Sequence, residues 1–218
     1  MKKSRLKDRF RSRRARFPEE SRLKWLPPLL DAYALIDKGI EIAVGREEAR
    51  RKDGLACRRG CSSCCRTHSD IPVYPHELMG IYWFVTEKMP APERLEVKAR
   101  LEGHEGRPPC PFLVGGACSI HVVRPAACRQ FNVFGTPCAE GEDPFFTRRK
   151  DVLTPIQDYA DRAFAAVLTL YRPDVRAGDL EEARKIIHTE ARNLQAHDWR
   201  ELVRIMDRHD RRAGPAPE

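Results

Sequence analysis

The sequence contains no apolar run long enough to cross a membrane. Its most apolar stretch, residues 163–170, is much shorter than the about 20 residues that a membrane-spanning helix needs. The basic N-terminal run also lacks the apolar segment and the small-residue cleavage site that would follow it in a secretory signal. We therefore expect the protein to be cytoplasmic.

The chain also lacks an internal repeat, a Gly-rich nucleotide loop and an alternation of strands with helices. The missing alternation argues against a β/α barrel. What the sequence does contain is 218 residues, of which 41% are hydrophobic and 33% are charged, a composition that suits one compact domain. Such a chain is long enough to bury a core without crosslinks.

The formal net charge of +8 is not spread over the chain. Residues 1–16 hold nine Lys and Arg against one acidic residue, which leaves 31 basic and 31 acidic residues in the remainder. A like-charged run repels itself and buries little apolar surface, so we expect residues 1–18 to form a disordered basic tail. The alternative is that residues 1–16 make an electrostatic contact with RNA or an anionic surface.

Helical periodicity dominates the chain outside its cysteine-rich part. Apolar residues return at three- and four-residue intervals from Leu29 to Val44, and Gly54 is expected to end this helix. Pro75 opens another helix, whose apolar stripe runs to Met89. Further helices are expected over residues 93–104, 124–131, 154–172, 180–194 and 200–206. These stripes are expected to form core contacts, so we assign them no chemistry.

The middle of the chain is expected to be irregular. Residues 56–66 show no periodicity and are interpreted as a loop that its ligands hold, and residues 71–74 as a short extended piece. Residues 110–120 have two short apolar runs that flank Gly115-Gly116, which predicts a tight hairpin. This hairpin would bring its two cysteines to neighbouring positions.

Eight cysteines are the most informative feature of the sequence. Thiols stay reduced in the cytoplasm, so clustered cysteines there usually serve metal binding or catalysis. Half of the cysteines form a C-x3-C-x2-C-C motif, made of Cys57, Cys61, Cys64 and Cys65. The glycine and the two serines inside the motif permit tight bends, so the loop could converge three sulfurs on one centre.

The vicinal pair Cys64-Cys65 is hard to aim at a single ion, because neighbouring side chains tend to diverge. The pair therefore indicates two metal centres or one polynuclear centre. The remaining cysteines, which a hairpin and a short helix would fold back over the loop, are Cys110, Cys118, Cys128 and Cys138. Eight thiolates would fill two tetrahedral sites. The alternative is that the cysteines form disulfides or are inert buried thiols.

Radical enzymes use the same C-x3-C-x2-C spacing to hold an iron–sulfur cluster and S-adenosylmethionine. In this chain the loop follows a helix rather than a barrel strand, and a fourth cysteine follows directly, so we discount a radical barrel. Arginines beside the ligands would offset the negative charge of a zinc–thiolate or iron–sulfur centre, unless they are ordinary surface residues. They are Arg58, Arg59, Arg66, Arg124 and Arg129.

Five pieces of sequence form a combined pattern. They are the Cys57–Cys65 motif, the extended piece leading to Glu77, Cys110-Pro-Phe-Leu, Cys118-Ser-Ile-His and Arg124-Pro-Ala-Ala-Cys128-Arg. The pattern resembles the YkgJ-type cysteine-cluster family, described as a zinc- or iron-chelating domain, over about residues 55–135. The resemblance implies metal binding by the cysteines of these motifs. Glu77 matches the family pattern, and its alternative role is a first-turn charge that the helix dipole favours.

Three further residues are candidate ligands. Cys138 lies beyond the core of the family pattern. His121 stands where the family usually carries tyrosine, so it is either an extra ligand or a packing histidine. His68, close to the motif, has the same two alternatives.

Together these patterns predict a mainly α fold with an irregular cysteine-rich metal-binding centre and one short hairpin. Residues 19–150 would form the cysteine-cluster domain, residues 151–212 a helical layer of the same domain, and residues 213–218 a tail. The bound cofactor would be zinc or an iron–sulfur cluster, because thiolates suit both.

Three classes of function stay open at this stage. The first is a metal-binding module whose cysteines are all saturated. The second is a metal-dependent enzyme, because larger relatives of the family, the flagellin lysine N-methylases, join such a cluster to methyl transfer; no catalytic residue can be assigned. The third is a metal-stabilised adaptor that binds RNA through residues 1–16.

Overall fold

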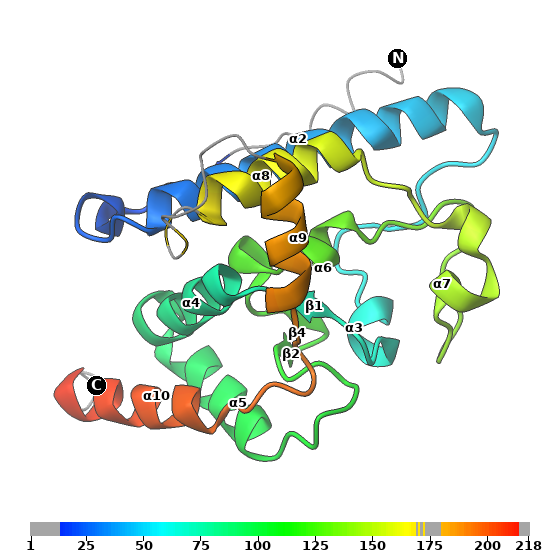
Figure 1. Ribbon diagram of the computed structural model, residues 1–218. Coiled ribbons are helices and arrows are strands. Elements are labelled where there is room, and N and C mark those ends of the chain that lie inside the picture. Colours follow the sequence, from blue (N-terminus) through cyan, green and yellow to red (C-terminus); the bar gives the residue numbers. More distant parts are fainter. Residues whose placement is uncertain (1–13, 169, 171, 173–179, 214–218) are drawn as a thin grey trace.

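The computed structural model describes residues 14–168, 170, 172 and 180–213 (Figure 1). Helices make up 57% of the chain and strands 6%, which confirms the expected mainly helical fold. Most of the expected basic tail lies outside the described residues. None of the described helices is both long and apolar enough to cross a membrane.

The structure is built from short elements around one long helix. The α-helices are α2 (Leu26–Arg50), α3 (Ser63–Thr67), α4 (Pro75–Trp83), α5 (Ala91–Glu102), α6 (Ala126–Gln130), α7 (Pro144–Thr147), α8 (Gln157–Leu168), α9 (Leu180–Glu190) and α10 (Arg200–Ala213). Short 3-10 turns are η1 (Pro18–Ser21), η3 (His121–Val123) and η4 (Arg149–Asp151), and the π-helical turn η2 (Phe84–Lys88) extends α4. The strands are β1 (Pro72–Val73), β2 (Leu113–Val114), β3 (Ala117–Cys118) and β4 (Arg192–Asn193).

Helix α2 runs along one side of the molecule, with α8 lying against it (Figure 1). The expected apolar stripe is buried, from Leu29 at 1% exposure to Val44 at 0%. Gly39 lets the two helices approach closely, because a Cβ atom there would lie 2.7 Å from the Cβ of Tyr159. The absence of a side chain at residue 39 therefore sets the distance between α2 and α8.

The main core joins parts of the chain that are far apart in sequence. It contains residues of α4 and α5, the loop before the hairpin, and α10. Phe112 and Trp199 illustrate this contact, since their rings meet edge to face with centroids 5.0 Å apart. Cys110 also belongs to this core. One part of the cysteine-rich region is therefore anchored in packed apolar residues.

Two small antiparallel sheets connect these parts. Strands β2 and β3 form the hairpin expected at Gly115-Gly116, with Leu113 opposite Cys118 and positive φ at both glycines. Strands β1 and β4 pair Pro72 with Asn193. The second pairing joins the segment after the cysteine motif to the C-terminal third.

The structure corrects two expected elements. The irregular loop expected over residues 56–66 ends in helix α3, which includes both residues of the vicinal pair. The helix expected over residues 180–194 stops at Glu190, because the next residues extend and pair with β1. Leu194 is buried in the main core, and its N–H donates to the carbonyl of Ile71.

Candidate metal centre

The first part of the cysteine motif is a loop held at one end by backbone pairing. The Ala56 N–H donates to the carbonyl of Val133 (2.8 Å), and the Val133 N–H donates to Cys57 Sγ (3.3 Å). A turn follows, in which the Cys61 N–H donates to the carbonyl of Arg58 (3.0 Å). Cys61 is exposed at the end of this turn. The loop is therefore fixed at Cys57 and open to solvent at Cys61.

The vicinal pair lies on helix α3. The Cys64 and Cys65 side chains hydrogen-bond to each other, and this bond, together with burial, raises the pKa of the Cys64 thiol. The carbonyl of Cys65 accepts a short hydrogen bond from the N–H of Cys110 (2.7 Å). This bond fastens α3 to the segment that precedes the hairpin.

Three cysteines from the two ends of the cysteine-rich region are neighbours, and we call them the outer group: Cys57, Cys61 and Cys138. Burial raises the pKa of the Cys57 thiol to about 11, and the neighbouring thiols of Cys61, Cys64 and Cys138 add to the rise. Burial also raises the pKa of the Cys138 thiol. The charge of Arg148 opposes this rise, whereas the neighbouring thiols of Cys61 and Cys64 add to it. The cysteine farthest along the sequence thus lies with the first ones.

Three other cysteines form the inner group: Cys110, Cys118 and Cys128. Burial raises the pKa of the Cys110 thiol to about 12, with Cys118 and Cys64 adding to the rise. Burial also raises the pKa of the Cys128 thiol, which Cys110, Cys64 and Cys118 increase further. Backbone N–H groups donate to two of these sulfurs, from Phe112 to Cys110 and from Ile120 to Cys118. Cys64 of the vicinal pair acts on thiols of both groups.

Glu77 fixes the helix that carries Cys128. Its side chain is 0% exposed, and its two oxygens accept from the N–H of Tyr74 (3.1 Å) and from the N–H of Ala126 (2.7 Å). The first bond caps α4 and the second caps α6. Burial raises the pKa of Glu77 to about 7. Its expected first-turn position is correct, but the contact with α6 has no signal in the sequence.

Arg129 holds the segment between the inner cysteines. Its guanidinium donates to the carbonyls of Arg124 (3.0 Å) and Val122 (2.5 Å) and to the carboxylate of Asp37 on α2 (2.8 Å). The same guanidinium lies over the ring of Tyr33, 4.0 Å from its centroid. Helix α2 therefore helps to position the cysteine-rich centre through Asp37 and Tyr33. The apolar stripe of this helix gave no indication of that role.

The comparisons with known proteins agree with this geometry. Residues 56–152 match the family CxxCxxCC, described as "Putative zinc- or iron-chelating domain", and all eight cysteines fall within the match. This segment resembles the family, and we call residues 56–152 the CxxCxxCC domain. The family resemblance seen in the motifs is thus confirmed, and the match extends past Cys138. No curated protein and no solved structure matches the chain.

Four arginines of the CxxCxxCC domain lie beside the cysteines without ion-pair partners among the described residues: Arg58, Arg59, Arg66 and Arg124. The Arg124 Nε atom is buried and has no hydrogen-bond acceptor in the described part of the chain. The charge of Arg124 lowers the pKa of the Cys118 thiol against the larger effect of burial. Arg129, the fifth arginine singled out in the sequence, is instead paired with Asp37.

The two candidate histidines have other neighbours. The Nε2 atom of His68 lies 3.3 Å from the carboxylate of Asp143, and its ring meets Phe131 edge to face. Burial lowers the pKa of His121 to about 4, and the charges that act on it come from Arg124, Arg129 and Asp37. In these contacts each histidine interacts with groups other than cysteine.

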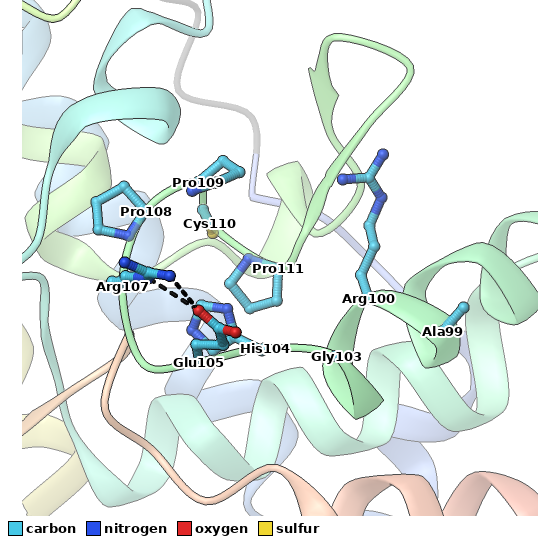
Figure 2. Close-up of a pocket in the computed structure, with 10 residues that line it drawn as sticks. All are labelled: Ala99, Arg100, Gly103, His104, Glu105, Arg107, Pro108, Pro109, Cys110 and Pro111. Atoms are coloured by element: carbon cyan, nitrogen blue, oxygen red, sulfur yellow. Dashed lines mark hydrogen bonds and ion pairs between the residues drawn. The ribbon is translucent and has the colours of Figure 1, made fainter.

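A cavity of about 460 Å³ lies within the CxxCxxCC domain, between the end of α5 and the segment before the hairpin (Figure 2). Its lining consists of Ala99, Arg100, Gly103, His104, Glu105, Arg107, Pro108, Pro109, Cys110 and Pro111. The polar groups in it already have partners, since Arg107 pairs with Glu105 and His104 Nε2 lies 2.9 Å from the carbonyl of Gln195. Cys110 is the one inner cysteine in this lining. The cavity therefore adjoins the inner group at Cys110.

The sulfurs are neighbours but do not form a closed set of ligands. Within the described part of the chain, no three His, Cys, Asp or Glu side chains stand close enough together to hold an ion. Ligation would require the cysteine side chains to turn toward common centres. The donor set suits zinc or iron, because thiolates bind both metals and the N–H groups directed at the sulfurs stabilise the thiolate form.

Proposed function

We propose that the CxxCxxCC domain binds zinc or iron through eight cysteine thiolates in two neighbouring sites. The outer site consists of Cys57, Cys61, Cys64 and Cys138. The inner site consists of Cys65, Cys110, Cys118 and Cys128. The observation that carries the proposal is the proximity of cysteines from distant parts of the chain, with Cys138 near Cys61 and Cys57, and Cys128 near Cys110 and Cys118.

The surroundings of Cys65 support assigning it to the inner site. The Cys65 carbonyl accepts from the N–H of Cys110, and the Cys65 side chain packs against the main core, as do Cys118 and Cys128. Cys64 acts on the thiols of both groups, on Cys57 and Cys138 as well as on the three inner cysteines, so it is free to complete the outer site once Cys65 is assigned to the inner one. Neighbouring side chains diverge, so the pair supplies one ligand to each site. Each site then has the four thiolates of a tetrahedral centre.

The charges around the cysteines support the same proposal. A divalent ion with four thiolates carries a net charge of minus two, so two such sites would carry minus four. The four positive charges of Arg58, Arg59, Arg66 and Arg124 would balance this charge of minus four. The buried Arg124 Nε would gain an acceptor if a thiolate formed beside it, and an unpaired buried donor otherwise costs about 1–3 kcal/mol.

The metal would add connections between the segments of the cysteine-rich centre. The motif loop, the hairpin and α6 are joined by individual hydrogen bonds and by the side chains of Glu77 and Arg129. Bound metal would fix these three segments together, and the free energy of binding would contribute to folding. We therefore expect metal removal to unfold the cysteine-rich centre.

Anaerobic purification followed by elemental analysis, sulfide analysis and a visible spectrum tests the proposal. We expect either a colourless protein with two zinc ions per chain or a brown protein that contains iron and sulfide. In both cases the thiols should react with a thiol reagent only after metal removal. A folded protein that carries no stoichiometric metal and has reactive thiols would refute the proposal.

A further inference from the structure

We infer that the two sites differ in metal exchange: the outer site exchanges its ion with ligands in solution, whereas the inner site retains its ion. This inference rests on the proposed function. The two sites then have different tasks. An ion that exchanges can pass between the outer site and other thiol or chelating ligands. An ion that is retained can serve the fold alone.

The outer group has little protection from solvent. Cys61 is exposed, and the hydrogen-bond partner of its sulfur is the Ser63 hydroxyl at 3.9 Å. Arg58, Arg59 and Gly60, which complete the turn, are exposed as well. A competing ligand could therefore approach an ion in the outer site from this side without any rearrangement of the core.

The segment that carries Cys138 is held by polar contacts instead of apolar packing. The residues on both sides of Cys138 are exposed. Beyond them, Glu142 pairs with Arg148 at 2.8 Å, and Asp143 lies 3.3 Å from His68. None of residues 139–143, which follow Cys138, is buried in a core. Cys138 can therefore leave the outer site more easily than a cysteine fixed in a core.

The inner group has the opposite surroundings. Cys110 is 6% exposed and packs in the main core with Phe112 and Ile120, both of which are almost fully buried. Backbone N–H groups hold two of its three sulfurs. Cys128 lies on α6, whose first turn is capped by the buried carboxylate of Glu77. To release an ion, this site would have to break packing and buried hydrogen bonds together.

Metal release from the full-length, zinc-loaded protein to a colorimetric chelator in excess tests the inference. We expect two phases of equal amplitude, one ion per chain in each. Cys138→Ser should remove the fast phase and leave the slow phase unchanged. Loss of a residue that merely supports a ligand weakens metal affinity by about 10–100-fold, and loss of the ligand itself should weaken it at least as much. Ser62→Ala, a change within the same motif that removes no ligand, serves as the control and should keep both phases.

The outcomes separate the inference from the function on which it rests. Two ions released in a single phase, or loss of the slow phase in Cys138→Ser, would overturn the inference and leave metal binding intact. Fewer than two ions in the wild-type protein would overturn the proposed function itself. Cys61→Ser gives an independent check of the outer site, and we expect it to behave as Cys138→Ser does. If instead it abolishes the slow phase, the assignment of the two sites is wrong.

Discussion

Replacement of Glu77 by glutamine should destabilise the protein, because an amide cannot make both hydrogen bonds of this carboxylate. The two oxygens of Glu77 accept from the N–H groups of Tyr74 and Ala126, and the side chain is 0% exposed. In Glu77→Gln, the amide nitrogen would face one of these N–H donors and could not accept. A buried N–H without an acceptor costs about 1–3 kcal/mol, which is the expected loss in the free energy of unfolding.

The pH dependence of this loss distinguishes a buried carboxyl from a simple packing defect. Burial raises the pKa of Glu77 in the folded protein to about 7, from an ordinary value of 4.5. Because the folded protein binds this proton more tightly than the unfolded chain does, protonation of Glu77 stabilises the fold. This stabilisation is fully present below the pKa of the unfolded chain and is lost as the pH rises through the pKa of the folded protein. We expect the free energy of unfolding of the wild type to fall by about 1 kcal/mol between pH 6 and pH 8 from this group.

Urea unfolding of the metal-loaded protein, followed by circular dichroism at pH 6 and pH 8, measures both effects. The difference between wild type and Glu77→Gln should be larger at pH 6. Glu87→Gln is the control, because Glu87 makes an ion pair with Arg22 at the surface. The reasoning fails if Glu77→Gln is as stable as Glu87→Gln at both pH values, or if the difference from wild type grows toward pH 8.

Further predictions concern helix α2 and the segment that it holds. Gly39→Ala should lower the free energy of unfolding by about 1–3 kcal/mol in urea titrations, because the added Cβ would collide with Tyr159 at 2.7 Å. Gly45→Ala on the same helix has no atom within 4 Å of the added Cβ and should instead raise stability by about 0.5–1 kcal/mol; equal effects of the two would contradict the packing of α2 on α8. Arg129→Met should cost about 1–3 kcal/mol, since it leaves two carbonyls and Asp37 without their donor. The same variant should lose metal faster to a chelator, and an unchanged release rate would show that this arginine does not position the inner group.

The helices could be predicted from the sequence because their apolar stripes have a local period. The stripe from Leu29 to Val44 gave α2, and Gly115-Gly116 gave the β2–β3 hairpin. The pairing of Pro72 with Asn193 could not be predicted, because no local pattern signals a contact between residues so far apart. Helix α3 was missed for a different reason: its residues are cysteine, serine, arginine and threonine, which show no apolar periodicity.

The sequence named the candidate ligands of the metal centre but not their arrangement. The motif and the family pattern identified the cysteines, since ligand spacing is a local property. The grouping of Cys138 with Cys57 depends on how the chain returns after α6, and sequence spacing does not encode that path. The capping of α6 by Glu77 is likewise a tertiary contact, made across 49 residues. Sequence therefore indicated the chemistry, whereas the division into an outer and an inner group required the structure.

X-ray absorption at the zinc and iron edges of the anaerobically purified full-length protein tests the central claim most directly. The account predicts that sulfur alone forms the first shell, with about four Zn–S distances near 2.3 Å for each zinc ion. Cys64→Ser and Cys65→Ser should each lower the average sulfur number, because each removes a ligand from a different site. A first shell of oxygen and nitrogen, or an unchanged sulfur number in both variants, would contradict it.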